Sequence, residues 1–99
     1  MNGIKMNEFY DLISHGHEAE FEYGGNTYIL QPEVNNSKTY LVIWDCTPNA
    51  KKCIIKQEID IEIDGDIPQP IIKTFLSKKC FKGKSFLEIE QEITVTVIY

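Results

Sequence analysis

The chain has 99 residues, of which 42% are hydrophobic and 11% aromatic, and this content predicts a single folded domain over residues 1–99. Its formal net charge is −5 and all ten basic residues are lysines, which disfavours sequence-specific binding of nucleic acid because that recognition depends on the planar fork of arginine. No apolar run approaches the roughly 20 residues that span a bilayer, and the first residues lack the apolar core of a signal peptide, so we expect a cytoplasmic protein that does not contact membranes.

The first predicted elements are a helix and a hairpin. Apolar residues recur at helical spacing up to Ile13, and Gly16 can end a helix in the left-handed conformation, which predicts a helix over about residues 7–14. Acidic and apolar residues then alternate as in a half-buried strand, and a Gly24-Gly25-Asn26 turn leads into a second β-rich run. This hairpin should direct three acids to solvent, namely Glu18, Glu20 and Glu22.

The middle of the chain predicts a second hairpin. Residues 38–46 and 51–63 are β-rich runs on either side of a Pro-Asn turn. The second run ends with isoleucines at alternate positions, so the acids between them should share one solvent-facing side of the strand. These acids are Asp60, Glu62 and Asp64.

Two helices and a strand are predicted for the last third of the chain. Apolar residues at helical intervals predict a helix over about residues 68–78 with Asp66 as its N-cap. Ser85 and Glu88 have the spacing of a capping box, which predicts a short helix over about residues 85–92, and the alternation in residues 94–99 predicts a strand. The order α-β-β-β-β-α-α-β indicates the α+β class, with a largely antiparallel sheet of about five strands and about three helices packed on it.

Two stretches of the sequence resemble a known family. They are EFYDLI followed after two residues by GHEAEFEYGGNTYIL (residues 8–30), and GKSFLEIEQEITV (residues 83–95). They look like the two ends of a family of small bacterial or phage proteins, of about this length and of unknown function. The resemblance implies the fold and a bacterial or phage origin, and it transfers no catalytic residue to this chain.

The segment DIEIDGDIPQPI, residues 60–71, has acids at positions 1, 3, 5 and 7 of a calcium-binding loop and a glycine at position 6. An EF-hand loop needs a glutamate at position 12, where this chain has Ile71, and a helix leading in, where this chain alternates like a strand. We therefore interpret the acids as the solvated side of a strand followed by a turn, with weak binding of Ca²⁺ or Mg²⁺ as the alternative.

The stretch KGKS, residues 82–85, matches only the end of a phosphate-binding loop, because the required earlier glycine is replaced by Lys78. Ser85 is better explained as a helix N-cap. Anion affinity near Lys82 and Lys84 is the alternative.

Histidine and cysteine residues give no complete site. His15 and His17 could supply two ligands to a metal, but no third ligand follows at a suitable spacing. Nearby lysines could lower the pKa of Cys80, although a packed, unreactive thiol is the simpler interpretation. The chain also contains Cys46 and Cys53, and an odd number of cysteines without metal-binding spacing predicts reduced thiols. We predict no catalytic residue, no cofactor and no resident metal ion.

The leading functional hypothesis is a non-enzymatic protein-binding or regulatory module, of the inhibitor or immunity type, that acts through a face or an edge of the sheet. The net charge and the acid-rich strands motivate it. Its candidate partner surface consists of Glu18, Glu20, Glu22, Asp60, Glu62 and Asp64. The alternative is a metal-binding sensor or small metal-dependent enzyme that uses His15, His17 and the acids from Asp60 to Asp66.

Overall fold

The computed structural model describes residues 1–47, 51–60 and 65–99. The helices in these ranges are α1 (Met6–Ser14), α2 (Gln69–Leu76) and α3 (Phe86–Ile89), and the 3₁₀-helix η1 (Glu90–Glu92) follows α3. The strands are β1 (Ala19–Tyr23), β2 (Asn26–Asn35), β3 (Lys38–Asp45), β4 (Lys52–Ile59), β5 (Lys79–Phe81), β6 (Lys84–Ser85) and β7 (Thr94–Ile98). The α+β class and the predicted order of the main elements are confirmed.

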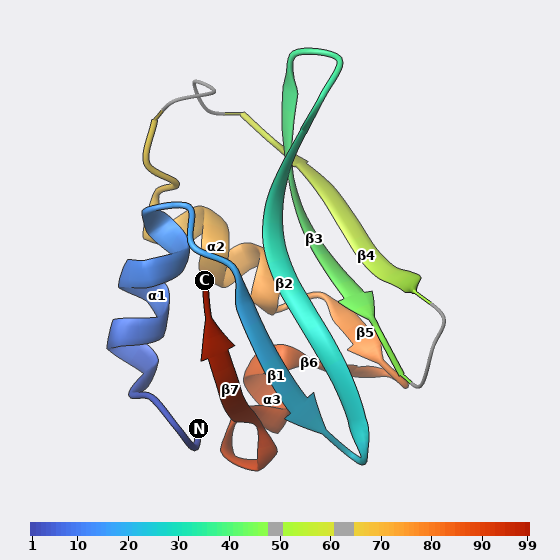
Figure 1. The fold of residues 1–99 in the computed structure, drawn as a ribbon. Coiled ribbons are helices and arrows are strands. Elements are labelled where there is room, and N and C mark those ends of the chain that lie inside the picture. Colours follow the sequence, from blue (N-terminus) through green and yellow to red (C-terminus); the bar gives the residue numbers. More distant parts are fainter. Residues whose placement is uncertain (48–50, 61–64) are drawn as a thin grey trace.

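The main sheet has the strand order β4-β3-β2-β1-β7, and all its neighbouring strands are antiparallel (Figure 1). The first four strands follow one another as a meander, and β7 returns from the helical part of the chain to pair with β1. The helices and the β5–β6 hairpin lie on the same side of this sheet (Figure 1). The other side is left without a covering element among the residues that the structure describes.

The hydrophobic core lies between the sheet and the helices, and phenylalanines dominate it. Phe9 of α1 stacks on Phe86 of α3 with the ring centroids 5.4 Å apart, and Phe86 meets Phe21 of β1 edge to face at 5.3 Å. All three side chains are fully buried, and such burial contributes about 1.5–3 kcal/mol for each side chain. The periodicities that predicted α1 and β1 therefore direct their apolar sides into one core.

Two tight turns set the register of the meander. The predicted turn at Gly24 and Gly25 connects β1 to β2, and both glycines have positive φ angles. The turn at Asn36 and Ser37 connects β2 to β3, with φ angles of 53° and 64°. Positive φ at both central residues is the geometry of a type I′ turn, whose twist matches that of paired strands. The β2–β3 pairing joins the two predicted hairpins into one sheet.

The start of α2 differs from the prediction. Its N-cap is Pro68, without a side-chain hydrogen bond, so the assignment of Asp66 as the cap is wrong. The segment before α2 is instead attached to the end of α1: the Ile67 amide donates to the Ser14 carbonyl at 2.8 Å, and the Ser14 hydroxyl donates to the Ile67 carbonyl at 2.7 Å. This contact between distant segments fixes where α2 begins.

The predicted capping box at the start of α3 is confirmed. The Glu88 amide donates to the Ser85 hydroxyl at 3.2 Å, and the Ser85 amide donates to the Glu88 carboxylate at 3.4 Å.

The short β5–β6 hairpin just before α3 was not predicted. The expected continuation of β4 over residues 61–63 lies outside the described residues. None of the helices described is both long enough and apolar enough to cross a bilayer.

Candidate functional site

The uncovered side of the main sheet, called the outer face here, carries the side chains that alternate with the core residues of β1–β4. Cross-strand pairing arranges them in rows. The row nearest the middle contains Glu20, Ile29, Trp44 and Cys53. The next rows contain Gln31, Val42 and Lys56, and then Glu33, Tyr40 and Glu58. The outer face therefore has an apolar centre with charged residues on both sides.

The centre of the outer face is a small packed cluster around Val42. Val42 is fully buried although it lies outside the main core cluster. It lies between Tyr40 and Trp44 on the same side of β3, and both of these aromatic residues are half-buried. The two aromatic side chains flank Val42 along β3 and, with the half-buried Ile29 beside Trp44, contribute the apolar surface of this face.

Hydrogen bonds to Glu33 fix the position of the Trp44 ring. The indole Nε1 of Trp44 donates to Glu33 Oε2 at 2.6 Å, and Nε2 of Gln31 donates to the same oxygen at 2.8 Å. The hydrogen bond from Gln31, together with the one from Trp44, lowers the pKa of Glu33 below its ordinary value of 4.5. An ionised carboxylate therefore holds the indole against the sheet.

Charges on the two sides of this centre differ. On the β3–β4 side, the Lys56 ammonium lies 4.5 Å from the centroid of the Tyr40 ring, and Lys38 pairs with Glu58 at 3.4 Å. On the β1 side, no ion pair within the described ranges involves Glu20 or Glu22. The β1 half of the outer face is therefore acidic.

Among the described residues, the Glu20 side chain has one hydrogen-bond donor. Its carboxylate accepts a hydrogen bond from the hydroxyl of Tyr99 at 3.1 Å, and this bond raises the pKa of Tyr99. Glu22 is exposed, and its backbone pairs with Thr27 of β2 and Thr94 of β7. Both acids remain accessible to a partner from outside the chain.

The residues of the predicted partner surface do not all lie together. Glu18 precedes β1, Glu20 and Glu22 lie on β1, and Asp60 is exposed beyond the end of β4. Glu62 and Asp64 are outside the described residues. The pairing places Ala19 level with Ile55, three strands away. From Ala19, Asp60 is roughly 14 Å across the sheet and roughly 16 Å further along it, given standard strand spacing and rise. The β1 acids and Asp60 are therefore separate features.

The sequence interpretation did not identify Glu33 as the residue that binds the Trp44 side chain. The alternation of Ile29, Gln31 and Glu33 was a usable signal for it, but Pro32 interrupts the pattern and argues against a central strand. The structure resolves this conflict because β1 ends its pairing with β2 at Leu30, so Pro32 has no β1 partner.

His15 and His17, the two histidines of the alternative metal-binding hypothesis, lie near different groups. Nδ1 of His15 lies 2.7 Å from the Asp11 carbonyl oxygen, and Nε2 lies 3.8 Å from the Asp66 carboxylate. Nδ1 of His17 instead lies 2.7 Å from the main-chain oxygen of Tyr99. The structure thus brings His15 near Asp66, one acid of the proposed set. Over the described ranges, no three His, Cys, Asp or Glu residues form a group that could hold a metal ion.

The cysteines are free thiols with different exposures. Cys46 and Cys80 are half-buried and Cys53 is exposed on the outer face. Burial raises the pKa of Cys80 to about 11, so the lysines around it do not produce a thiolate at neutral pH. One of them, Lys79, binds Glu88 at 2.8 Å instead.

No family model, curated protein or solved structure matches this chain in the comparisons made.

Proposed function

We propose that this chain is a non-enzymatic binding module whose outer face binds a partner protein with a basic surface. One arrangement supports the proposal: Trp44, held by the ionised Glu33, lies in the same cross-strand row as Glu20 of β1, with Ile29 between them. Neither Glu20 nor Glu22 has an ion-pair partner in the described part of the chain. Tryptophans in such positions contribute strongly to protein interfaces, since a large rigid side chain loses little freedom on binding.

The chemistry of the face defines the partner. Glu20, Glu22 and Glu33 would attract lysine or arginine side chains, and Trp44 would pack against an apolar patch between them. The net charge of −5 adds a long-range attraction for a basic protein. A partner held in this way has its basic surface masked, which is how an inhibitor or immunity protein acts.

We propose the cytoplasm as the place of action. All three cysteines are free thiols, and thiols persist in a reducing compartment.

The test compares matched variants as baits for proteins of the source cell. Glu22→Lys and Glu8→Lys both reverse one exposed glutamate, the first on the outer face and the second on α1. Trp44→Ala removes the apolar centre. A basic protein retained by the wild type and Glu8→Lys, but lost by Glu22→Lys and Trp44→Ala, is the expected result.

The contact site on that complex is then mapped by hydrogen exchange. Protection should be concentrated in β1, β2 and β3. A bound protein that tolerates both outer-face substitutions, or the absence of any protein that distinguishes the baits, would contradict the proposal.

A further inference from the structure

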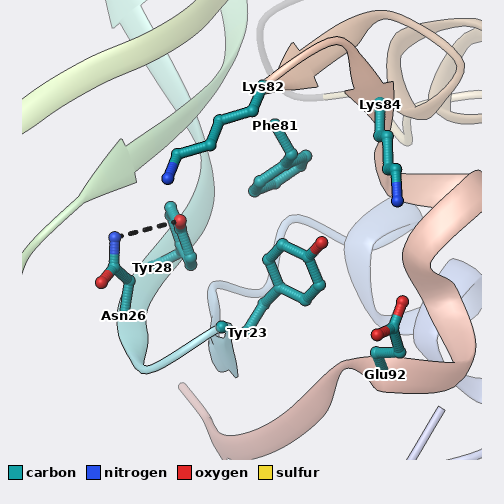
Figure 2. Close-up of a pocket in the computed structure, with 8 residues that line it drawn as sticks. Tyr23, Asn26, Tyr28, Phe81, Lys82, Lys84 and Glu92 are labelled. Carbon is teal, nitrogen blue, oxygen red and sulfur yellow. Dashed lines mark hydrogen bonds between the residues drawn. The ribbon is translucent and has the colours of Figure 1, made fainter.

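A cavity of about 500 Å³ lies between the β1–β2 turn and the β5–β6 hairpin (Figure 2). It is on the core side of the sheet, because Tyr23 and Tyr28 alternate with the outer-face residues Glu22 and Thr27. The cavity is therefore separate from the proposed partner face. Its volume lies within the range of small-molecule sites, about 300–1,000 Å³.

Three aromatic rings form the wall of this cavity. Phe81 of β5 is buried and meets Tyr23 and Tyr28 edge to face, with ring centroids 5.8 Å and 5.2 Å apart. Figure 2 shows the three rings close together, with Lys82 and Asn26 on one side of them and Lys84 and Glu92 on the other. Rings in this arrangement offer flat π surfaces on which another planar ring can stack.

Two lysines of the β5–β6 hairpin line the same cavity. Lys82 extends from the hairpin toward Tyr28 and Asn26, whereas Lys84 extends on the other side of the rings toward Glu92 (Figure 2). Neither lysine forms an ion pair with a described residue. Lys82 has a φ of 52° and Gly83 a φ of 85°, the geometry of a type I′ turn. Asn, Asp and Gly are the residues that usually occupy the Lys82 position. A lysine there adds a cation to the cavity at a conformational cost.

The polar groups near Lys82 also favour an anion there. The Tyr28 hydroxyl accepts a hydrogen bond from Asn26 Nδ2 at 3.4 Å, and in the described structure it donates to no protein group. Burial raises the pKa of Tyr28, so the hydroxyl keeps its proton and can donate it. Among the described residues that line the cavity, Glu92 has the one carboxylate, and with the two lysines it gives a net charge of +1.

We propose that this cavity binds a small molecule with a planar aromatic or heteroaromatic ring and one anionic group, either a carboxylate or a phosphate ester. The ring would stack against Phe81 and Tyr23. The anionic group would bind Lys82 and the Tyr28 hydroxyl, and Lys84 would add to the positive charge of the cavity from the other side of the rings. This site could be occupied whether or not the outer face holds a protein.

The test is a titration of the ¹⁵N-labelled full chain followed by NMR. 2-Naphthoate and adenosine 5′-monophosphate are the two probes, and they distinguish the carboxylate from the phosphate source. Adenosine is the control for a ring without an anion, and inorganic phosphate the control for an anion without a ring. At least one probe should shift the amides of residues 23–28 and 81–84 and bind at least about tenfold more tightly than both controls.

Variants assign the binding to the cavity. Lys82→Gln should weaken the bound probe about five- to tenfold and Lys84→Gln by a smaller factor, whereas Lys78→Gln, the same change at an exposed lysine outside the cavity, should not weaken it. Glu92→Gln should strengthen binding, an effect that damage to the fold cannot produce.

Three results would overturn the proposal. They are the absence of shifts with both probes at millimolar concentration, equal binding of inorganic phosphate, and shifts located away from the cavity. Each would leave the proposed partner face unaffected, because no residue of that face lines the cavity.

Discussion

Glu33 accepts hydrogen bonds from Trp44 and Gln31 through one carboxylate oxygen, and this makes it the residue that orders the centre of the outer face. Replacing Glu33 with Ala leaves the half-buried indole N–H without its acceptor. We expect a loss of about 1 kcal/mol in the free energy of unfolding, measured by urea denaturation at neutral pH. Tryptophan emission should shift to longer wavelength as the ring gains contact with water.

The pH dependence of this effect has a definite sign. The pKa of Glu33 is lowered in the folded state, so its contribution is present above about 4.5 and is lost as pH falls through the folded-state pKa. The difference between wild type and Glu33→Ala should therefore shrink at about pH 3. Glu33→Gln, which keeps an acceptor oxygen, is the control. A difference that does not change with pH would show that the charge of Glu33 is unimportant.

Thr39 is a buried residue whose hydroxyl has no hydrogen-bond partner within the described ranges. Thr39→Val removes this hydroxyl and keeps the shape of the side chain, so the free energy of unfolding should rise by about 1 kcal/mol. The control is Thr96→Val, whose exposed hydroxyl donates to the Glu20 carbonyl at 3.2 Å and should give no gain. A destabilised Thr39→Val variant would indicate that the hydroxyl is satisfied, for example by water.

At the scale of elements, the cap of α3 illustrates how a short local signal sets the position of a helix. Ser85→Ala removes the acceptor of the Glu88 amide, and the variant should lose about 1 kcal/mol of stability, measured by thermal or urea unfolding. Ser77→Ala, at the exposed end of α2, removes a hydroxyl that donates rather than accepts and should have a smaller effect. Equal losses in the two variants would contradict the capping account.

The contact between α1 and the segment before α2 should respond to pH. The Asp11 carbonyl, aided by the carboxylates of Asp66 and Asp11, raises the pKa of His15 above its ordinary value of 6.5. A raised pKa contributes stability that is present below about 6.5 and is lost as pH rises through the folded-state pKa. His15→Gln should therefore lower the melting temperature more at about pH 5.5 than at about pH 8.5.

Asp66→Asn tests the origin of that response. Because it removes one of the carboxylates that favour the protonated ring, it should reduce the difference between the two pH values. An unchanged pH dependence in this variant would show that Asp66 does not act on His15.

Elements with strong local signals were predicted well. The helical spacing of α1, the Gly24-Gly25 turn and the capping box at Ser85 each involve residues close in the sequence. The β5–β6 hairpin was missed because its strands have only three and two residues, too few for an alternating pattern. Its position depends on the contact of Phe81 with Tyr28, which is distant in the sequence.

The candidate site was only partly predictable for the same reason. Alternation along β1 correctly separates Glu20 and Glu22 from the core residue Phe21. The bond between Trp44 and Glu33 depends on the register of β2 on β3, which the Asn36-Ser37 turn sets and the sequence interpretation did not include. The separation of Asp60 from β1 depends on strand order, which no local pattern contains.

At the scale of the whole molecule, helices cover one side of the sheet and acids stand on the other. This division lets one chain hold an aromatic cavity near its core and an acidic face toward solvent, with separate ligands proposed for each. A net charge of −5 should speed the approach of a basic protein, and the acids of β1 should direct it to the outer face.

The association rate of the captured basic protein, measured by stopped flow at two ionic strengths, tests this account most directly. The rate for the wild type should fall as salt rises, because salt screens exposed charges. Glu22→Lys should associate more slowly and with a weaker salt dependence, with a nearly unchanged melting temperature, and Glu8→Lys should reduce the rate less. A rate independent of salt, or equal rates for the two variants, would contradict the assignment of the outer face as the partner surface.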